Sequence, residues 1–250
     1  MLPFLNQLPL ELIWLLQIPV CYSFLLLSLR LLGASGIFLF NSVAIVLANL
    51  QVLKAVSLYP FENPIALGTV VFSTTFLGTD ILSEYFDKKT AQKAILAGFI
   101  GLLFSTVLMT LTIGMAPPSG QPSSSWFIEN HFHLEAIFKP APALLVSGMM
   151  AYWISQWFDV ALFNRMKKKS HGRFLWLRNN VSTALSALVD NTIFSLLAWI
   201  VLAADPLPWR TVIFSYILGT YGIRLFLAVI DTPIIYIAQF CLPRSQLPIK

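Results

Sequence analysis

The stretch IALGTVVFSTTFLGTDILSEYFDKK (residues 65–89) is long and apolar enough to cross a membrane, yet it meets two acids before its lysines. A helix needs about 20 mostly apolar residues to span a bilayer. Asp80 and Glu84 stand four residues apart, so a helix places both carboxylates on one face. Ionised carboxylates in hydrocarbon are costly unless they face a partner or a wet cavity. The stretch therefore predicts a membrane helix that lines or stabilises a polar cavity.

The composition of the whole chain agrees with a membrane location. Of its 250 residues, 57% are hydrophobic and 11% are charged, whereas soluble domains carry roughly a quarter charged residues. This chain has too little polar surface to cover a water-soluble globule. We expect an integral membrane protein without a cleavable signal peptide, because the first twenty residues lack Lys, Arg and a small-residue cleavage site.

Seven apolar stretches are long enough to span, near residues 10–29, 37–58, 65–86, 92–115, 141–163, 181–203 and 211–236. They predict an all-α membrane protein, a polytopic bundle of about seven transmembrane helices with no soluble domain. The interval 116–140 is the longest connection. It opens with breaker-rich PPSGQPSSS and continues as WFIENHFHLEAIF, so we expect an outer loop that lies along the membrane surface or dips in as a lid.

The basic residues fall mostly in alternate loops, which predicts the orientation. One set of loops holds Arg30, Lys88, Lys89, Lys93, Arg165, Lys167, Lys168, Lys169, Arg173, Arg178, Arg244 and Lys250, whereas the other holds Lys54, Lys139 and Arg210. This split predicts an outer N-terminus and a cytoplasmic tail at 242–250, in the inner (cytoplasmic) membrane. The run NRMKKKSHGR (164–173) then reads as a cytoplasmic loop beside anionic lipid, not as a nucleic-acid site.

Five acids fall within the expected spans, namely Asp80, Glu84, Asp159, Asp190 and Asp231. Arg224 is the one base expected at membrane depth, with Arg178 reaching in from the inner edge. This surplus of acids must be protonated, solvated or paired with a ligand. We expect a polar cavity that opens towards the cytoplasm and is built by the third, fifth, sixth and seventh spans.

Several of these residues also have a structural interpretation. Glu84 could reach the interface beside Lys88. Asp231 and Arg224, seven residues apart, could form an ion pair along one helix. Asp190 lies deepest in its span and has no local base, which favours a functional role.

Polar and aromatic residues near the acids extend the candidate site. Asn49 is expected to hydrogen-bond between helices. Gln156 and Asp159 share a helix face, and so do Trp153 and Gln156. Trp153 could belong to an aromatic belt at the interface or stack on a flat ligand.

Motifs for other chemistries are lacking. The chain has no HExxH, CxxC, GxSxG or Walker-type sequence, and its two cysteines, Cys21 and Cys241, lie in opposite terminal segments. His131 and His133 form an HxH, but two histidines without a third ligand are weak evidence for a metal. We therefore expect neither an enzyme nor a bound metal or cofactor.

Four segments resemble the vitamin uptake transporter family, known for queuosine precursor transporters of the YhhQ type. They are TTFLGTDILSEYFDKKTAQKAI (74–95), AYWISQWFDVALFNRMK (151–167), LWLRNNVSTALSALVDNTIF (175–194) and YGIRLFLAVIDTPIIYI (221–237). The resemblance divides the chain into an extra N-terminal transmembrane helix (1–35) and a six-helix transporter core (36–241).

The resemblance implies import of 7-deazaguanine bases such as preQ0, preQ1 or queuine through a central acid-lined cavity. Asp80, Asp159 and Asp190 would recognise the base, with Gln156 and Asn49 as amide partners. Phe76 and Trp153 would stack on the ring, Glu84 would line or stabilise the cavity, and Arg224 and Asp231 would hold a kink or gate in the last helix. Proton coupling, the preferred base and the oligomeric state stay open.

Other functions remain open beside a solute carrier. The chain could be the substrate-binding subunit of an ATP-driven importer, or a carrier of another flat heterocycle or vitamin. A membrane enzyme would use a carboxylate pair such as Asp80 and Glu84, and an assembly factor would bind no ligand saturably.

Overall fold

The computed structural model describes residues 7–58, 65–118, 124–138, 141–203 and 205–243. Its helices are α2 (Leu10–Leu32), α3 (Ala34–Gln51), α4 (Thr69–Tyr85), α5 (Lys88–Ile113), α6 (Ser124–Phe138), α7 (Ala141–Lys169), α8 (Leu175–Leu196), α9 (Trp209–Thr211) and α10 (Thr220–Cys241). Two π-helical segments, η1 (Leu197–Val201) and η2 (Val212–Gly219), extend α8 and precede α10. Two short strands, β1 (Ala55–Val56) and β2 (Ile65–Ala66), pair antiparallel.

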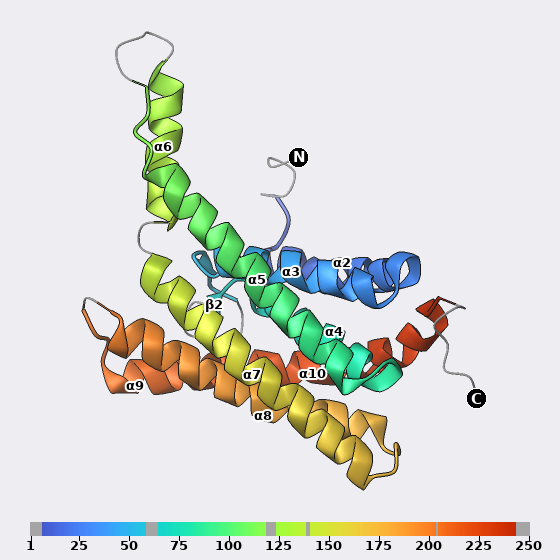
Figure 1. The fold of residues 1–250 in the computed structure, drawn as a ribbon. Helices are drawn as coiled ribbons and strands as arrows, with labels where there is room; N and C mark the ends of the chain where they lie inside the picture. The colour runs from blue at the N-terminus through green and yellow to red at the C-terminus, as the bar shows by residue number, and fades with distance from the viewer. Residues whose placement is uncertain (1–6, 59–64, 119–123, 139–140, 204, 244–250) are drawn as a thin grey trace.

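The chain folds as an all-α polytopic membrane protein, as the sequence predicts. Five helical stretches are long and apolar enough to cross a membrane: α2, α3, α5, the stretch 175–201 and the stretch 209–241. α4 and α7 complete the bundle without meeting that standard (Figure 1). α4 has 17 residues, and every one from Ser73 to Ser83 is buried. A helix enclosed by protein needs no apolar surface towards lipid, so it can carry polar side chains.

Helix α4 is the centre of the bundle. It packs against α2, α3, α5, α7 and α10 (Figure 1). Its start is later than the expected residue 65, because Ile65 and Ala66 belong to β2 and Gly68 adopts a left-handed φ of 93°. The second span likewise ends earlier than expected, at Gln51, where the chain turns into β1.

Two other elements differ from the sequence expectations. Residues 164–169 are helical, because α7 continues to Lys169, so the basic run is mainly a helix end and not a loop. Within 116–140, residues 124–138 form α6, which contacts α5 and α7 and lies away from the centre of the bundle (Figure 1). Trp126 and Phe132 on α6 are largely exposed.

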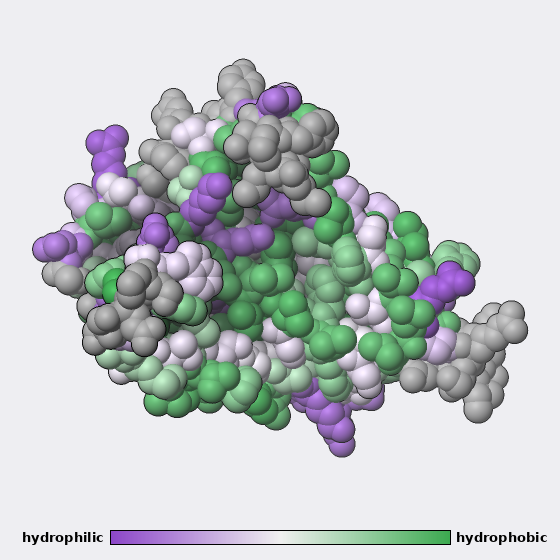
Figure 2. Space-filling model, turned by 90° about the horizontal axis from the view of Figure 1, so that it is seen from above, coloured by the Kyte–Doolittle hydropathy of each residue, from purple (hydrophilic) through white to green (hydrophobic). Residues whose placement is uncertain are grey.

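Hydrophobic side chains cover most of the face shown in Figure 2, and hydrophilic ones form small separate groups. Large apolar residues are exposed on the helices that could span, for example Phe24 on α2, Phe104 on α5 and Phe240 on α10. The interior also contains polar groups: Asp80, Gln156 and many other polar side chains are buried. An apolar surface around buried polar groups suits a protein whose surface faces lipid and whose polar residues face the inside of the bundle.

Candidate functional site

A cavity of about 130 Å³ lies between the helices. Its polar lining includes Asn49, Asp190, Asn191 and Arg224, and its aromatic lining comprises Phe72, Phe194, Trp199 and Tyr216. The volume has room for about ten water-sized atoms, which is the scale of one small ring system.

The position of the cavity differs from the sequence expectation. It lies between the end of α3, the first turn of α4, the first half of α7, the end of α8 and the two π segments. Lys88 is the first residue of α5, and Lys167 lies in the last turn of α7; both are at the end of the bundle away from this cavity. This cavity therefore lies away from the basic end, towards which the sequence predicted an opening, and ion pairs join the helices at that basic end.

The floor of the cavity is an ion pair between α8 and α10. Arg224 Nη2 lies 2.7 Å from Asp190 Oδ2, and the Ser155 hydroxyl donates to Asp190 Oδ1 at 2.9 Å. The guanidinium carbon of Arg224 lies 4.8 Å from the centre of the Phe72 ring. Arg224 Nη1 is buried and has no hydrogen-bond partner among the described residues. At the cavity floor, an N–H donor of Arg224 without a partner thus lies next to the Asp190 carboxylate.

This pair corrects two expectations. Asp190 does have a base in contact, and the partner of Arg224 is Asp190 instead of Asp231. Asp231 accepts a hydrogen bond of 2.5 Å from the Tyr22 hydroxyl on α2. Arg224 and Asp231 therefore hold different neighbours and do not join each other within α10.

Two of the four aromatic residues that line the cavity come from the π segments. The rings of Trp199 on η1 and Tyr216 on η2 lie 4.9 Å apart. The indole N–H of Trp199 is buried and has no partner among the described residues. π-helical turns occur frequently at functional sites, because the extra residue re-aims side chains. Sequence analysis missed both residues, since no motif in the chain marks a π segment.

The two aromatic residues chosen from the sequence lie elsewhere. Phe76 is buried beneath the cavity, with its ring 5.6 Å from that of Phe72, which does line the cavity. Trp153 packs 5.0 Å from Phe99 and is not among the lining residues. Phe72 could have been found from the sequence, because it is one turn from Phe76 on the same helix face.

A polar layer lies on the basic side of the cavity, around Gln156. The Gln156 amide donates to the Thr75 hydroxyl at 2.8 Å and accepts from the Thr79 hydroxyl at 3.0 Å, so it joins α7 to α4. Asp80 and Asp159 are fully buried in the same layer. None of these three predicted residues lines the cavity, whereas Asn49, Asp190 and Arg224 do.

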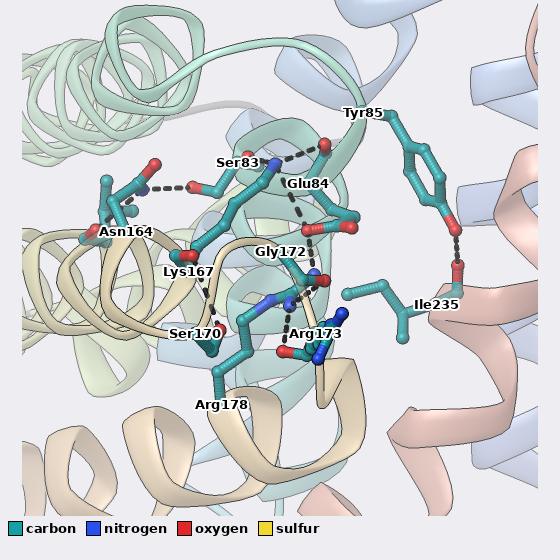
Figure 3. A network of polar contacts seen from close by, with 11 residues as sticks. Ser83, Glu84, Tyr85, Asn164, Lys167, Ser170, Gly172, Arg173, Arg178 and Ile235 are labelled. Carbon is teal, nitrogen blue, oxygen red and sulfur yellow. Dashed lines mark hydrogen bonds and ion pairs between the residues drawn. The ribbon is translucent and has the colours of Figure 1, made fainter.

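Glu84 belongs to a cluster at the basic end, drawn in Figure 3. It pairs with Arg178, which is almost fully buried, and with Lys167 at 3.2 Å. Lys167 also donates to the backbone carbonyls of Ser83 at 2.9 Å and Glu84 at 2.6 Å, which are free acceptors at the end of α4.

The same cluster extends to the loop before α8 and to α10. Arg178 donates to the carbonyls of Gly172 and Arg173, both at 2.9 Å. The Tyr85 hydroxyl donates to the Ile235 carbonyl of α10 at 2.8 Å (Figure 3). The expected partner Lys88 is not part of this cluster. These contacts tie α4, α7, α8 and α10 together at one end.

The histidines of the HxH sequence lie on α6. His133 is 3.6 Å from Glu129, and both side chains are mostly exposed. Among the described residues, no group of three or more His, Cys, Asp or Glu could hold a metal ion.

A bundle that crosses the membrane and holds a small cavity with a charged floor and aromatic walls has the architecture of a membrane transporter. A family model described as "Putative vitamin uptake transporter" matches residues 66–238. The chain therefore belongs to this family, which comprises transporters and not enzymes.

A curated relative agrees with this assignment. The chain is 32% identical over 235 residues to a "Probable queuosine precursor transporter" of Bacillus subtilis (strain 168), covering 93% of this chain and 96% of the relative. No solved structure matches the chain. The family model starts at residue 66, whereas α2 and α3 pack against α4 as part of the same bundle.

Proposed function

We propose that this protein imports a queuosine precursor, a 7-deazaguanine base such as preQ0, preQ1 or queuine. The observation that carries the proposal is the cavity floor, where a carboxylate and an unused guanidinium N–H stand side by side beneath aromatic rings. The name of the Bacillus subtilis relative supports the same ligand class.

The chemistry of the base fits this floor. A guanine-like edge presents two adjacent N–H donors and, beside them, a carbonyl acceptor. The Asp190 carboxylate can accept the N–H groups, because each of its oxygens has more than one lone pair. Arg224 Nη1 can donate to the carbonyl. The flat ring can stack against Phe72, Trp199 or Tyr216, as bases do on aromatic side chains in nucleic-acid-binding proteins.

The orientation follows from the positive-inside rule and belongs to the same proposal. With the basic end of the bundle in the cytoplasm of a bacterial cell, the cavity faces the outside. A base would then enter from the outer side and rest on the Asp190–Arg224 pair. The cluster around Glu84 and Arg178 would close the route to the cytoplasm until the helices rearrange.

The test is uptake of labelled preQ0, preQ1 and queuine into lipid vesicles that contain this protein alone. Saturable uptake of one base, competed by the others and not by adenine, is the expected result. Binding without uptake would favour a substrate-binding subunit that needs an ATPase partner. Absence of both binding and uptake, with folded protein in the vesicles, would refute the proposal and favour another flat heterocycle.

A further inference from the structure

We propose that Asp80 and Asp159 form a binding site for a single proton, and that this proton is the coupling ion of transport. The coupling half of the proposal rests on the proposed function, whereas the proton site stands on the geometry of the two side chains.

The carboxyl groups of Asp80 on α4 and Asp159 on α7 both accept hydrogen bonds from α8, where Thr183 and Ser186 lie about one helical turn apart. Both side chains are fully buried, and the negative charge of Asp159 acts directly on Asp80. On α8, Thr183 donates to Asp80 Oδ2 at 3.3 Å and Ser186 donates to Asp159 Oδ1 at 2.8 Å. The remaining oxygens, Asp80 Oδ1 and Asp159 Oδ2, receive no hydrogen bond from the described protein groups. Each carboxyl group thus keeps one buried oxygen free.

Two buried carboxyl groups so close together require that one of them carries a proton. Ionised carboxylates are acceptors only, so two of them can hydrogen-bond to each other only if one carries a proton. Two buried like charges at such close range repel strongly, and a shared proton removes one of the two charges, as in the paired aspartates of acid proteases.

Within the described part of the chain, no basic side chain supplies the missing charge. Arg224 is paired with Asp190 on the cavity side. Arg178 and Lys167 are paired with Glu84 on the other side. Among the described residues, Asp231 on α10 is a further acid whose charge acts on the pair. It is hydrogen-bonded to Tyr22 of α2. α3 carries no charged residue, and the lysines of α5 stand at its exposed first turns.

The pair lies on the path between the cavity and the basic end. Phe72, Phe76, Asp80 and Glu84 follow one another at intervals of four on α4, so Asp80 is about 12 Å along the helix from the cavity wall. On α7, Asp159 is one turn beyond Ser155, which donates to Asp190 at the cavity floor. A ligand that moves Asp190 therefore moves residues one helical turn from the pair.

Transport is coupled to the proton through uptake and release of one proton by the Asp80–Asp159 pair. The pair takes one proton from the side to which the cavity opens and then carries one negative charge in total. Release of that proton to the opposite side leaves two carboxylates, whose repulsion separates α4 from α7. Because α4 and α7 also carry Glu84 and Lys167, this separation opens the basic end.

The first experiment needs no substrate. Infrared spectra of the reconstituted protein should show a protonated-carboxyl band at neutral pH that Asp80→Asn and Asp159→Asn each reduce by the same amplitude. The double variant should lose no more than either single one, because one proton is shared. The matched control is Asp205→Asn, an exposed carboxylate, which should leave the band unchanged. Unchanged bands in both single variants, or additive losses in the double variant, would overturn the shared-proton site.

The second experiment tests coupling with labelled preQ0 in vesicles. An inside-alkaline gradient of one pH unit can drive about a tenfold accumulation of a neutral solute carried with one proton. Wild type and Asp205→Asn should accumulate the base, whereas Asp159→Asn should only equilibrate it. Accumulation by Asp159→Asn, or accumulation that follows a sodium gradient instead, would overturn proton coupling. If wild type carries no base at all, the proposed function fails, and the infrared result still decides the proton site.

Discussion

Asp190 on α8 and Arg224 on α10 meet at 2.7 Å on the floor of the cavity, and Arg224 keeps one N–H group that no described residue uses. Arg224 has a free Nη1, and Asp190 spends one oxygen on Ser155 and the other on Arg224. The pair is nearly enclosed, so each charge depends on the other. A ligand that binds here would therefore contact two charged groups, Asp190 and Arg224, that hold each other in fixed positions.

The variant Asp190→Asn should abolish uptake while the protein still inserts in the membrane. It leaves Arg224 as a buried charge without its partner, which costs about 3–5 kcal/mol in comparable buried pairs. Labelled-base uptake and thermal unfolding in detergent measure the two effects. The double variant Asp190→Asn/Arg224→Gln separates them: it should regain stability without regaining uptake. Normal uptake by Asp190→Asn in stable protein would contradict the assignment of the floor.

The variant Tyr22→Phe should loosen α2 from α10. It removes the hydrogen bond to Asp231 and leaves a buried carboxyl group unsatisfied, which should lower the free energy of unfolding by about 1–3 kcal/mol. The midpoint of thermal unfolding in detergent checks this. Tyr236→Phe on α10 is the matched control, because that side chain is 42% exposed. Equal midpoints for the two variants would show that the Tyr22–Asp231 bond contributes little.

Within the Glu84 cluster, loss of Arg178 should cost more than loss of Lys167. The Arg178 side chain is 1% exposed and that of Lys167 is 29% exposed, and exposed ion pairs contribute at most about 1 kcal/mol. We expect Arg178→Met to lower the unfolding midpoint clearly and Lys167→Met to lower it slightly. The comparison is made in detergent at low and high salt. A larger effect of Lys167→Met would argue against burial as the source of the difference.

The variant Gly78→Ala should destabilise the contact between α3 and α4. A Cβ at this position would lie 2.6 Å from Asn41 Oδ1 and 3.1 Å from Ile37 Cγ2. Relieving such overpacking costs about 1–3 kcal/mol. Gly222→Ala on α10 is the control, because nothing lies within 4 Å of its added Cβ. Alanine there should be neutral or stabilising by up to about 1 kcal/mol, since it favours helix more than glycine does. The unfolding midpoints of the two variants should therefore shift in different directions or by different amounts.

Much of the fold was accessible from the sequence. The low share of charged residues and the long apolar runs predicted an all-α membrane protein, and five of the runs form helices long and apolar enough to span. The motifs around Asp80, Asp159, Asp190 and Asp231 predicted the family, which the comparisons confirm. The cost of a charge in hydrocarbon predicted that these acids face the inside of the bundle, and all four are buried. The division at residue 35, the membrane orientation and the substrate roles of the site residues stay predictions.

The sequence by itself determined which faces of the helices are polar, because side chains four residues apart share a face whatever the fold. Only the tertiary structure decided which faces meet. Arg224 could have reached Asp231 within its own helix, but the packing of α10 on α8 brings it to Asp190. The end at which the cavity lies depends on contacts between segments far apart in the chain, such as Glu84 with Arg178 at the basic end. Helical periodicity holds no information about such contacts.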